Sequence, residues 1–322
     1  MRALWVVQFV SMGRMLSRRA FGWGMAGAVA ARMTAGRSLL GQVAGSQTGM
    51  GPGTGATGKG PQFSVMMWAL NKQGSFEENL ERVAKAGYRH VELVGEFEKW
   101  SEADWRRILA RMQALKITVD ATSGVKAGFA DPSGGDAFLA ELKAFIPAVQ
   151  KLGCGQIILL SGKRVEGAAA GAQKAASVDA LKRAADVLGA AGLMAVIEPI
   201  DRLENPPIYL DGVTEAFEIV RAVGSPHVKV LYDLYHEQRG LGNLIEKLEK
   251  NINEVGLIHI ADVPGRHEPG TGEVNYGNVY RKLGELHYKG VIAMEFYPSG
   301  DVVETLRKAR EEAMRGCGVG WV

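Results

Sequence analysis

The chain has 322 residues, of which 47% are hydrophobic, and this is enough for one large α/β domain with a continuous core. Its formal net charge of +3 is unevenly distributed, because residues 1–37 hold six of the 38 basic residues and no acidic ones. Residues 38–322 therefore carry 32 basic and 35 acidic residues, a net charge of −3, which argues against a main role in binding the phosphate backbone of a nucleic acid.

Residues 1–40 resemble a twin-arginine export signal. The sequence Ser17-Arg18-Arg19-Ala20-Phe21 precedes an apolar, uncharged stretch over residues 22–31. We therefore expect export to the periplasm. The apolar stretch is too short to remain as a membrane-spanning helix, so no lasting membrane span is expected. The alternative is a disordered basic tail on a cytoplasmic protein. Residues 41–61, rich in Gly, Ser and Thr, are expected to form a flexible linker.

From residue 62 onward, apolar runs alternate with segments of helical periodicity. Eight such runs, 27 to 39 residues apart, centre near Ser64, Val91, Thr118, Ile157, Val196, Val230, Ile258 and Ile292. Eight strand–helix units of this size predict an α/β fold, a (β/α)8 barrel over residues 62–322. An open doubly wound sheet is the alternative, and the lack of a Gly-rich phosphate turn after the first run argues against it.

The segments between the runs carry helix signals. In residues 76–87 the apolar side chains fall on one face, Ser75 is a candidate N-cap with Glu78 as its capping-box partner, and Gly87 is a candidate stop. Similar periodicity predicts helices over Val213–Val223, Leu241–Leu248 and Val302–Ala313.

Metal-binding residue types end four successive apolar runs. They are Glu198, Asp233, His259 and Glu295. A buried carboxylate is costly unless it is satisfied, and the carboxyl ends of parallel barrel strands meet at one face. The pattern therefore predicts a site for one divalent cation, Mg²⁺ or Mn²⁺ first, with Co²⁺ or Zn²⁺ as alternatives. The competing interpretation is four unrelated residues at strand ends.

Three further residues in the following loops are candidates for substrate binding. His236 comes three residues after Asp233, where it could contact a substrate oxygen. Arg266 matches an anionic substrate because its planar fork pairs with a carboxylate, although it could instead brace its loop by pairing with Glu268 or Glu273. Glu268 is expected either to contact the substrate or to support the residues that contact the substrate.

Several stretches resemble the hydroxypyruvate isomerase family, a member of the xylose-isomerase-like barrel superfamily that also holds ketose 3-epimerases and endonuclease IV. The similarity is densest over residues 190–300, and its most specific element is the Val-Pro-x-Arg-x-Glu-Pro loop. The stretches are Ile197-Glu198-Pro199, Tyr232-Asp233-Leu234-Tyr235-His236-Glu237-Gln238, Gly242-Asn243-Leu244, Ile260-Ala261-Asp262-Val263-Pro264-Gly265-Arg266-His267-Glu268-Pro269 and Gly272-Glu273-Val274-Asn275-Tyr276.

The resemblance implies an aldose–ketose type isomerisation that interconverts hydroxypyruvate and tartronate semialdehyde through an enediolate. It implies that Glu198 and Glu295 are the acid/base pair as well as metal ligands. The chain departs from the family at His259, where Gln is frequent and where His is typical of ketose 3-epimerases. It departs again at Tyr297, where a basic residue is expected. The departures leave a ketose 3-epimerase, or a related sugar isomerase acting outside the cytoplasm, as the alternative.

Two readings from other functional classes are weaker. An endonuclease acting on apurinic sites would need a multi-metal cluster with many His ligands, and the whole chain has six His. It would also need a basic face for DNA, whereas residues 38–322 are net acidic. A non-catalytic exported binding protein would not be expected to keep both Glu198 and Glu295. The expected partner is a small hydroxy-carbonyl substrate, with no nucleic acid, and a homo-oligomer is left open. Residues near the first four strands that could face the substrate are Trp68, Glu92, Thr122 and Lys163.

The two cysteines show no metal-binding spacing. Cys154 lies at the start of a predicted buried strand and Cys317 lies near the carboxyl end, and they are expected to be independent thiols.

Overall fold

The computed structural model describes residues 60–319. The expected signal region, residues 1–40, and nearly all of the expected linker, residues 41–61, lie outside the described residues. Within residues 60–319, no helix combines the length and the apolar character needed to cross a membrane.

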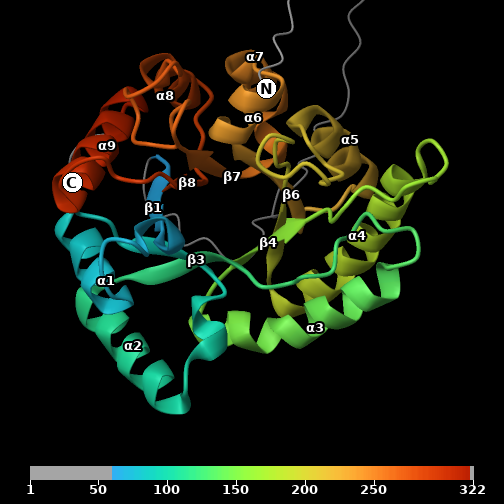
Figure 1. Cartoon of the computed structure of the whole chain (residues 1–322), viewed down its shortest axis with the longest axis horizontal. Coiled ribbons are helices and arrows are strands. Elements are labelled where there is room, and N and C mark those ends of the chain that lie inside the picture. Colours follow the sequence, from blue (N-terminus) through green and yellow to red (C-terminus); the bar gives the residue numbers. More distant parts are fainter. Residues whose placement is uncertain (1–59, 320–322) are drawn as a thin grey trace, which may run out of the picture. The chain divides into compact units, whose positions relative to one another are not determined.

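Eight parallel strands close into a barrel in sequence order (Figure 1). Every apolar run predicted from the sequence contains or overlaps one of them, because strands covered by helices are continuously apolar. The strands are β1 Gln62–Met66, β2 His90–Val94, β3 Thr118–Ser123, β4 Gln156–Leu160, β5 Met194–Glu198, β6 Val228–Asp233, β7 Val255–Ile260 and β8 Val291–Met294.

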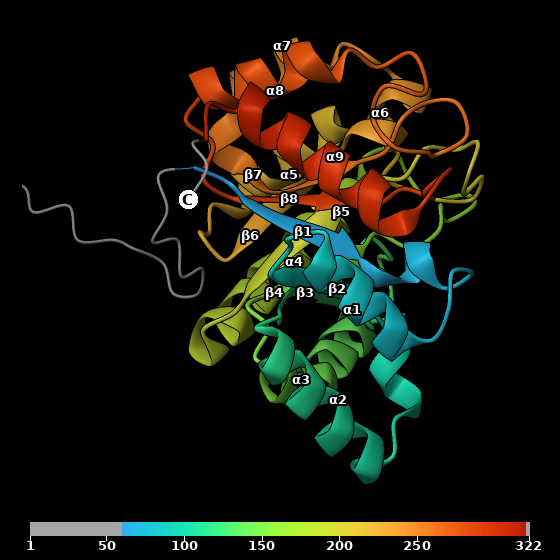
Figure 2. The same cartoon turned by 90° about the vertical axis from the view of Figure 1, so that its left-hand side faces the viewer.

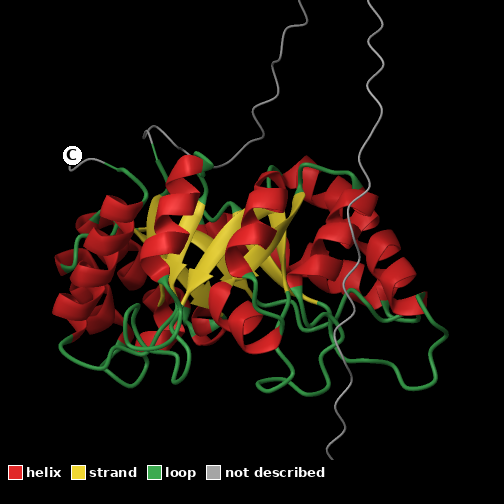
Figure 3. Cartoon of the chain, turned by 90° about the horizontal axis from the view of Figure 1, so that it is seen from above, coloured by secondary structure: helices red, strands yellow, loops and turns green. Residues whose placement is uncertain are grey.

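Helices surround the strands on the outside (Figure 3). In Figure 2 the neighbouring helices α8 and α9 run alongside each other on one side of the barrel. The α-helices are α1 Phe76–Lys85, α2 Glu102–Leu115, α3 Gly135–Leu152, α4 Ala172–Ala191, α5 Val213–Val223, α6 Leu234–Gly240, α7 Leu244–Asn251, α8 Tyr276–Glu285 and α9 Val302–Gly316, and the 3-10 turns are η1 Met67–Leu70, η2 Glu96–Lys99 and η3 Ile252–Glu254.

The helix signals in the sequence are largely confirmed. Ser75 and Glu78 form the predicted capping box of α1, and Gly87 has a positive φ of 93° just after the helix ends. The helix predicted from Leu241 instead begins at Leu244. Its first turn is broken because Gly242 and Asn243 both adopt left-handed backbone conformations, with φ of 62° and 57°.

The core has two layers. The larger one lies between the strands and the helices. The smaller one fills the inside of the barrel with side chains from Met66, Ala121, Ile158, Val196, Leu231, Leu257, Val291 and Ala293. The barrel is therefore closed by packed side chains, and chemistry is confined to the loops and strand ends at its carboxyl face.

Candidate metal centre and active site

The carboxyl ends of β5 to β8 bring the four expected metal ligands together. Glu198 and Asp233 are the last residues of β5 and β6, His259 lies in β7, and Glu295 directly follows β8. Asp233 and His259 are register partners on neighbouring strands. All four residues are buried, and one ligand atom from each lies within 4.8 Å of the others.

One oxygen of this group lacks a hydrogen-bond donor. Asp233 Oδ1 accepts hydrogen bonds from the backbone N–H groups of Tyr235, at 2.7 Å, and His236, at 3.3 Å. These bonds fix the carboxylate, and they leave Oδ2 buried without a hydrogen-bond partner. Because an unsatisfied buried carboxylate oxygen is costly, the three carboxylates and one imidazole fit a divalent cation well.

His259 is held between two carboxylates. Its Nδ1 lies 2.9 Å from Glu295 Oε2, on the side of the expected ion, and its Nε2 lies 2.9 Å from Glu92 Oε2. Burial acts to lower the pKa of His259, but Glu295 and Glu92 outweigh it and raise the pKa above its usual range. Glu92, on β2, is fully buried against the imidazole and is not among the residues that line the cavity over the metal ligands.

The two glutamates at the rim have different electrostatic environments. Burial, together with the negative charge of Glu295, raises the pKa of Glu198 to about 7. Burial also acts on Glu295, but His259 and Arg266 hold its pKa below the usual range. Trp68 Nε1 donates a hydrogen bond to Glu295 Oε1 at 3.1 Å, which fixes the second oxygen of that carboxylate.

Arg266 forms one wall of the site. Its Nη2 lies 2.8 Å from Glu295 Oε2, and its Nη1 lies 2.7 Å from Glu204 Oε1. The guanidinium carbon is 5.2 Å from the ring centroid of Trp68 and 4.8 Å from that of Tyr235. Within the described chain Arg266 pairs with neither loop glutamate considered from the sequence, and its charge faces the site.

The loop that carries Arg266 is organised by Asp262. This fully buried carboxylate accepts backbone N–H bonds from Val263, Gly270 and Gly272 at 2.9 Å each and from Val274 at 3.1 Å. Four backbone N–H groups that donate to one carboxylate hold the loop in one conformation, and this positions Arg266.

His236 also lines the site. Its Nδ1 lies 2.7 Å from Asp201 Oδ2, and its Nε2 lies 3.5 Å from Asp233 Oδ2. Asp201, Glu204 and His236 could in principle form a second ligand group, but Arg239 Nη1 lies 3.2 Å from Asp201 and 3.0 Å from Glu204. A cation of the protein therefore already balances these two carboxylates.

The remaining expected substrate residue lies apart from the site. Glu268 accepts hydrogen bonds from the backbone N–H of Ser299, at 3.0 Å, and from the Ser299 hydroxyl, and it does not line the cavity over the four ligands. Thr122 donates to the Leu93 carbonyl inside the barrel wall at 2.9 Å, so its hydroxyl serves the fold.

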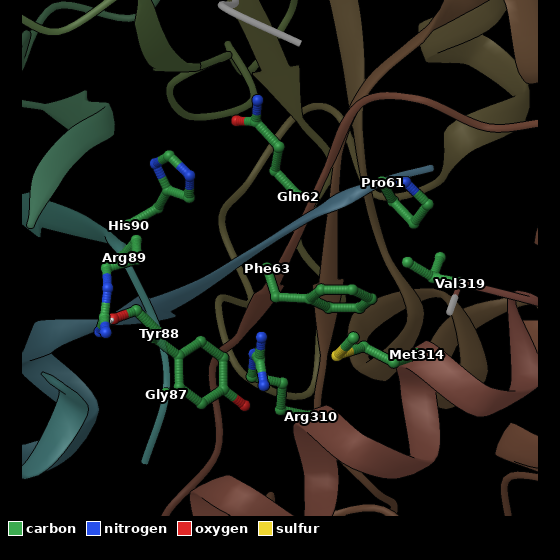
Figure 4. Close-up of a pocket in the computed structure, with 10 residues that line it drawn as sticks. All are labelled: Pro61, Gln62, Phe63, Gly87, Tyr88, Arg89, His90, Arg310, Met314 and Val319. Carbon is green, nitrogen blue, oxygen red and sulfur yellow. Dashed lines mark hydrogen bonds between the residues drawn. The ribbon is translucent and has the colours of Figure 1, made fainter. Parts of the chain in front are cut away.

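A cavity of about 180 Å³ lies over the ligands. Its walls include Trp68, Glu198, His236, Arg266 and Glu295. A separate cavity of about 220 Å³ lies at the amino-terminal end of the strands, where side chains of β1, of the segment before β2 and of α9 surround it (Figure 4). Barrels of this type carry their active sites at the carboxyl end, so the first cavity is the candidate active site.

Comparison with known proteins agrees with this fold. The profile of the family described as Xylose isomerase-like TIM barrel matches residues 80–315. Hydroxypyruvate isomerase of Escherichia coli strain K12 is 29% identical over 252 residues, which cover 76% of this chain and 97% of the relative. The 2-oxo-tetronate isomerase of Haemophilus influenzae is 27% identical over 252 residues, with 76% and 97% covered.

A solved structure shows the same barrel. The AP endonuclease, family 2, from Brucella melitensis superimposes with a TM-score of 0.70 at 25% identity, covering 76% of this chain and 96% of that one. The chain belongs to the xylose isomerase-like TIM barrel family. Because the two sequence relatives are named isomerases, the chain is an enzyme of the isomerase class.

Proposed function

We propose that the chain is a metal-dependent isomerase that interconverts hydroxypyruvate and tartronate semialdehyde. The observation that carries this proposal is the placement of two buried glutamates, Glu198 from β5 and Glu295 after β8, on either side of Asp233 and His259. A 1,2 proton shift needs one group that takes a proton from carbon and one that returns a proton to the next carbon.

The residues of the site supply each part of the shift. Glu198, Asp233, His259 and Glu295 would hold the cation, which when bound polarises the substrate carbonyl and stabilises negative charge on its oxygens. One glutamate takes the proton from C3 of hydroxypyruvate, and the other delivers a proton to C2. The hydroxyl proton moves from O3 to O2, so the product is an isomer and nothing is consumed.

The walls of the cavity favour a small anionic substrate. Arg266 offers positive charge beside Glu295, and His236 has its pKa raised to about 9 by Asp233 and Asp201 although burial opposes this. Both cations can bind the substrate carboxylate or stabilise the charge of the enediolate. A volume of about 180 Å³ is sufficient for a three-carbon acid.

A ketose 3-epimerase is the second candidate, and His259 favours it. In that reaction the same two glutamates would act on opposite faces of a single carbon, so Glu198 and Glu295 remain the acid/base pair.

The two candidates separate in one experiment on the full-length protein with added Mg²⁺ or Mn²⁺. Hydroxypyruvate and a set of free ketoses are incubated with the wild type, with Glu198→Gln and with Glu268→Gln, and products are separated by chromatography. The proposal expects tartronate semialdehyde from hydroxypyruvate with the wild type and with Glu268→Gln, and none with Glu198→Gln. Conversion of ketoses alone would favour the epimerase.

We further propose that the chain is exported by the twin-arginine route, on the strength of the Arg18-Arg19 pair and the apolar stretch over residues 22–31. The full-length protein with a carboxyl-terminal tag is produced in a Gram-negative host. Periplasmic recovery should be lost when Arg18 and Arg19 are both changed to Lys. Cytoplasmic retention of the wild type would contradict the export proposal and leave the chemistry untouched.

A further inference from the structure

A third cavity, larger than the one over the metal ligands, adjoins the candidate active site. Its volume is about 600 Å³, and it shares Val94, Ser123 and Leu160 with the cavity over the metal ligands. These three residues lie at the carboxyl ends of β2, β3 and β4. The two spaces are therefore neighbours along one side of the barrel mouth, and hydroxypyruvate, with three carbons, would leave the larger one unused.

The outer wall of this cavity is held in place by the backbone. Lys163 forms an antiparallel bridge with Ile208, Arg164 N–H donates to the Pro207 carbonyl at 2.7 Å, and Tyr209 N–H donates to the Gly162 carbonyl at 2.9 Å. Backbone hydrogen bonds thus join the segment after β4 to the segment before Leu210, and they define the backbone positions of Lys163 and Arg164.

The buried side chain of Gln173 forms hydrogen bonds with the backbone of the same segment. Gln173 accepts a hydrogen bond from the Val165 N–H at 3.0 Å and donates to the Lys163 carbonyl at 3.0 Å. The loop that holds Gly128 packs directly against this segment, because a Cβ added at Gly128 would lie 2.4 Å from the Gly162 Cα. Only glycine permits this approach of the two loops, so the cavity has a preformed shape.

The lining of the cavity carries excess positive charge. Lys126, Lys163 and Arg164 line it against a single carboxylate, Asp131, which accepts hydrogen bonds from Ser133. Among residues 60–319 no carboxylate pairs with Lys163 or with Arg164, and the Arg164 guanidinium donates to the carbonyl of Ile208 at 3.2 Å. Lys126 has an exposed partner, Glu98, at 3.1 Å.

Lys163 and Arg164 are exposed cations with no acidic partner among residues 60–319, and hydrogen bonds hold the backbone that carries them at the edge of the cavity. Such an arrangement favours an anionic ligand. Apolar side chains of Val125, Leu160 and Ile208 line the cavity beside these cations and would pack against a carbon chain.

We propose that this cavity binds the distal anionic group, a carboxylate or a phosphate, of a substrate with four or more carbons. The hydroxy-carbonyl end of that substrate lies over Glu198 and Glu295, and its far end reaches Lys163 and Arg164. The reaction in this inference rests on the proposed function. The preference for an anionic substrate group rests only on the residues that line the cavity. The inference extends the proposed substrate range beyond hydroxypyruvate to sugar acids or sugar phosphates with a second anionic group.

Binding measured by calorimetry tests the charge preference without turnover. The ligands are 4-phospho-D-erythronate, with a terminal phosphate, D-glucarate, with a terminal carboxylate, and D-gluconate, which keeps the first carboxylate and lacks the distal anion, each titrated into the full-length protein in Mg²⁺ buffer. At least one of the two ligands with a distal anion should bind at least tenfold more tightly than D-gluconate, and the stronger of the two identifies the anion. Equal binding of D-gluconate would overturn the proposal.

Two variants separate the cavity from general charge effects. Lys163→Met should weaken binding of the preferred ligand with a distal anion about tenfold and leave binding of D-gluconate unchanged, whereas Lys289→Met, which removes an exposed lysine away from the cavity, should change neither. Unchanged anion binding in Lys163→Met would overturn the inference. If anion binding depends on Lys163 but no substrate is isomerised, the proposed function fails and the anion site stands.

Discussion

Replacing Glu92 by Gln should weaken metal binding although Glu92 is not itself a ligand. Glu92 Oε2 lies 2.9 Å from His259 Nε2, while His259 Nδ1 faces Glu295. A carboxylate at Nε2 keeps the ring proton there, so that Nδ1 presents its lone pair to the ion. Gln keeps the volume but can donate its amide to Nε2, which would move the proton to Nδ1 and block the ligand atom.

The expected magnitude follows from the contact. Loss of a hydrogen bond to a metal-bound imidazole typically costs about 10- to 100-fold in metal affinity, or roughly 1.4 to 2.8 kcal/mol. Titration calorimetry with Mn²⁺ on the full-length wild type and Glu92→Gln measures it. Asp120→Asn is the matched control, because this neighbouring carboxylate accepts from the Ser64 hydroxyl at 2.9 Å and not from His259. A Glu92→Gln affinity within about twofold of the wild type would refute the reasoning.

Three further predictions concern the reaction, the loop and the thiols. Glu198→Gln and Glu295→Gln should each lower kcat by about 10²-fold or more in steady-state assays and leave the circular dichroism spectrum unchanged, and near-normal rates in either would refute the acid/base pair. Asp262→Ala should lower the free energy of unfolding in urea by more than about 2 kcal/mol, because four backbone donors lose their acceptor; a change below about 0.5 kcal/mol would count against that role. Burial raises the pKa of Cys317 to about 12 and that of Cys154 further, so neither should react with a disulfide reagent at pH 8 until the protein unfolds, when both should; a reactive thiol in the native protein would contradict this.

The barrel and the convergence of the four ligands were predictable from sequence for one physical reason. Helix-covered parallel strands are continuous apolar runs, and their carboxyl ends share one face, so the last residues of successive runs meet. Glu198, Asp233 and His259 could therefore be grouped from their positions alone. The start of α7 was misplaced because periodicity does not register the left-handed turn at Gly242 and Asn243.

The contacts that shape the site were not predictable in the same way. Glu92 and His259 are 167 positions apart, and the partner of Arg266, Glu204, is 62 positions away. No local pattern joins such pairs, because they meet only once the barrel closes. The position of Glu268 could not be predicted for a related reason. Its sequence neighbourhood resembles the family loop, but the folded loop turns its carboxylate toward Ser299.

Proton NMR of hydroxypyruvate in heavy water with the full-length protein and Mg²⁺ or Mn²⁺ tests the central claim most directly, with Glu198→Gln beside it. A 1,2 proton shift through an enediolate predicts loss of the C3 proton signal and growth of a semialdehyde signal with the wild type, and neither with the variant. If the C3 signal stays constant over many enzyme equivalents while the metal is bound, hydroxypyruvate isomerisation at Glu198 and Glu295 is contradicted.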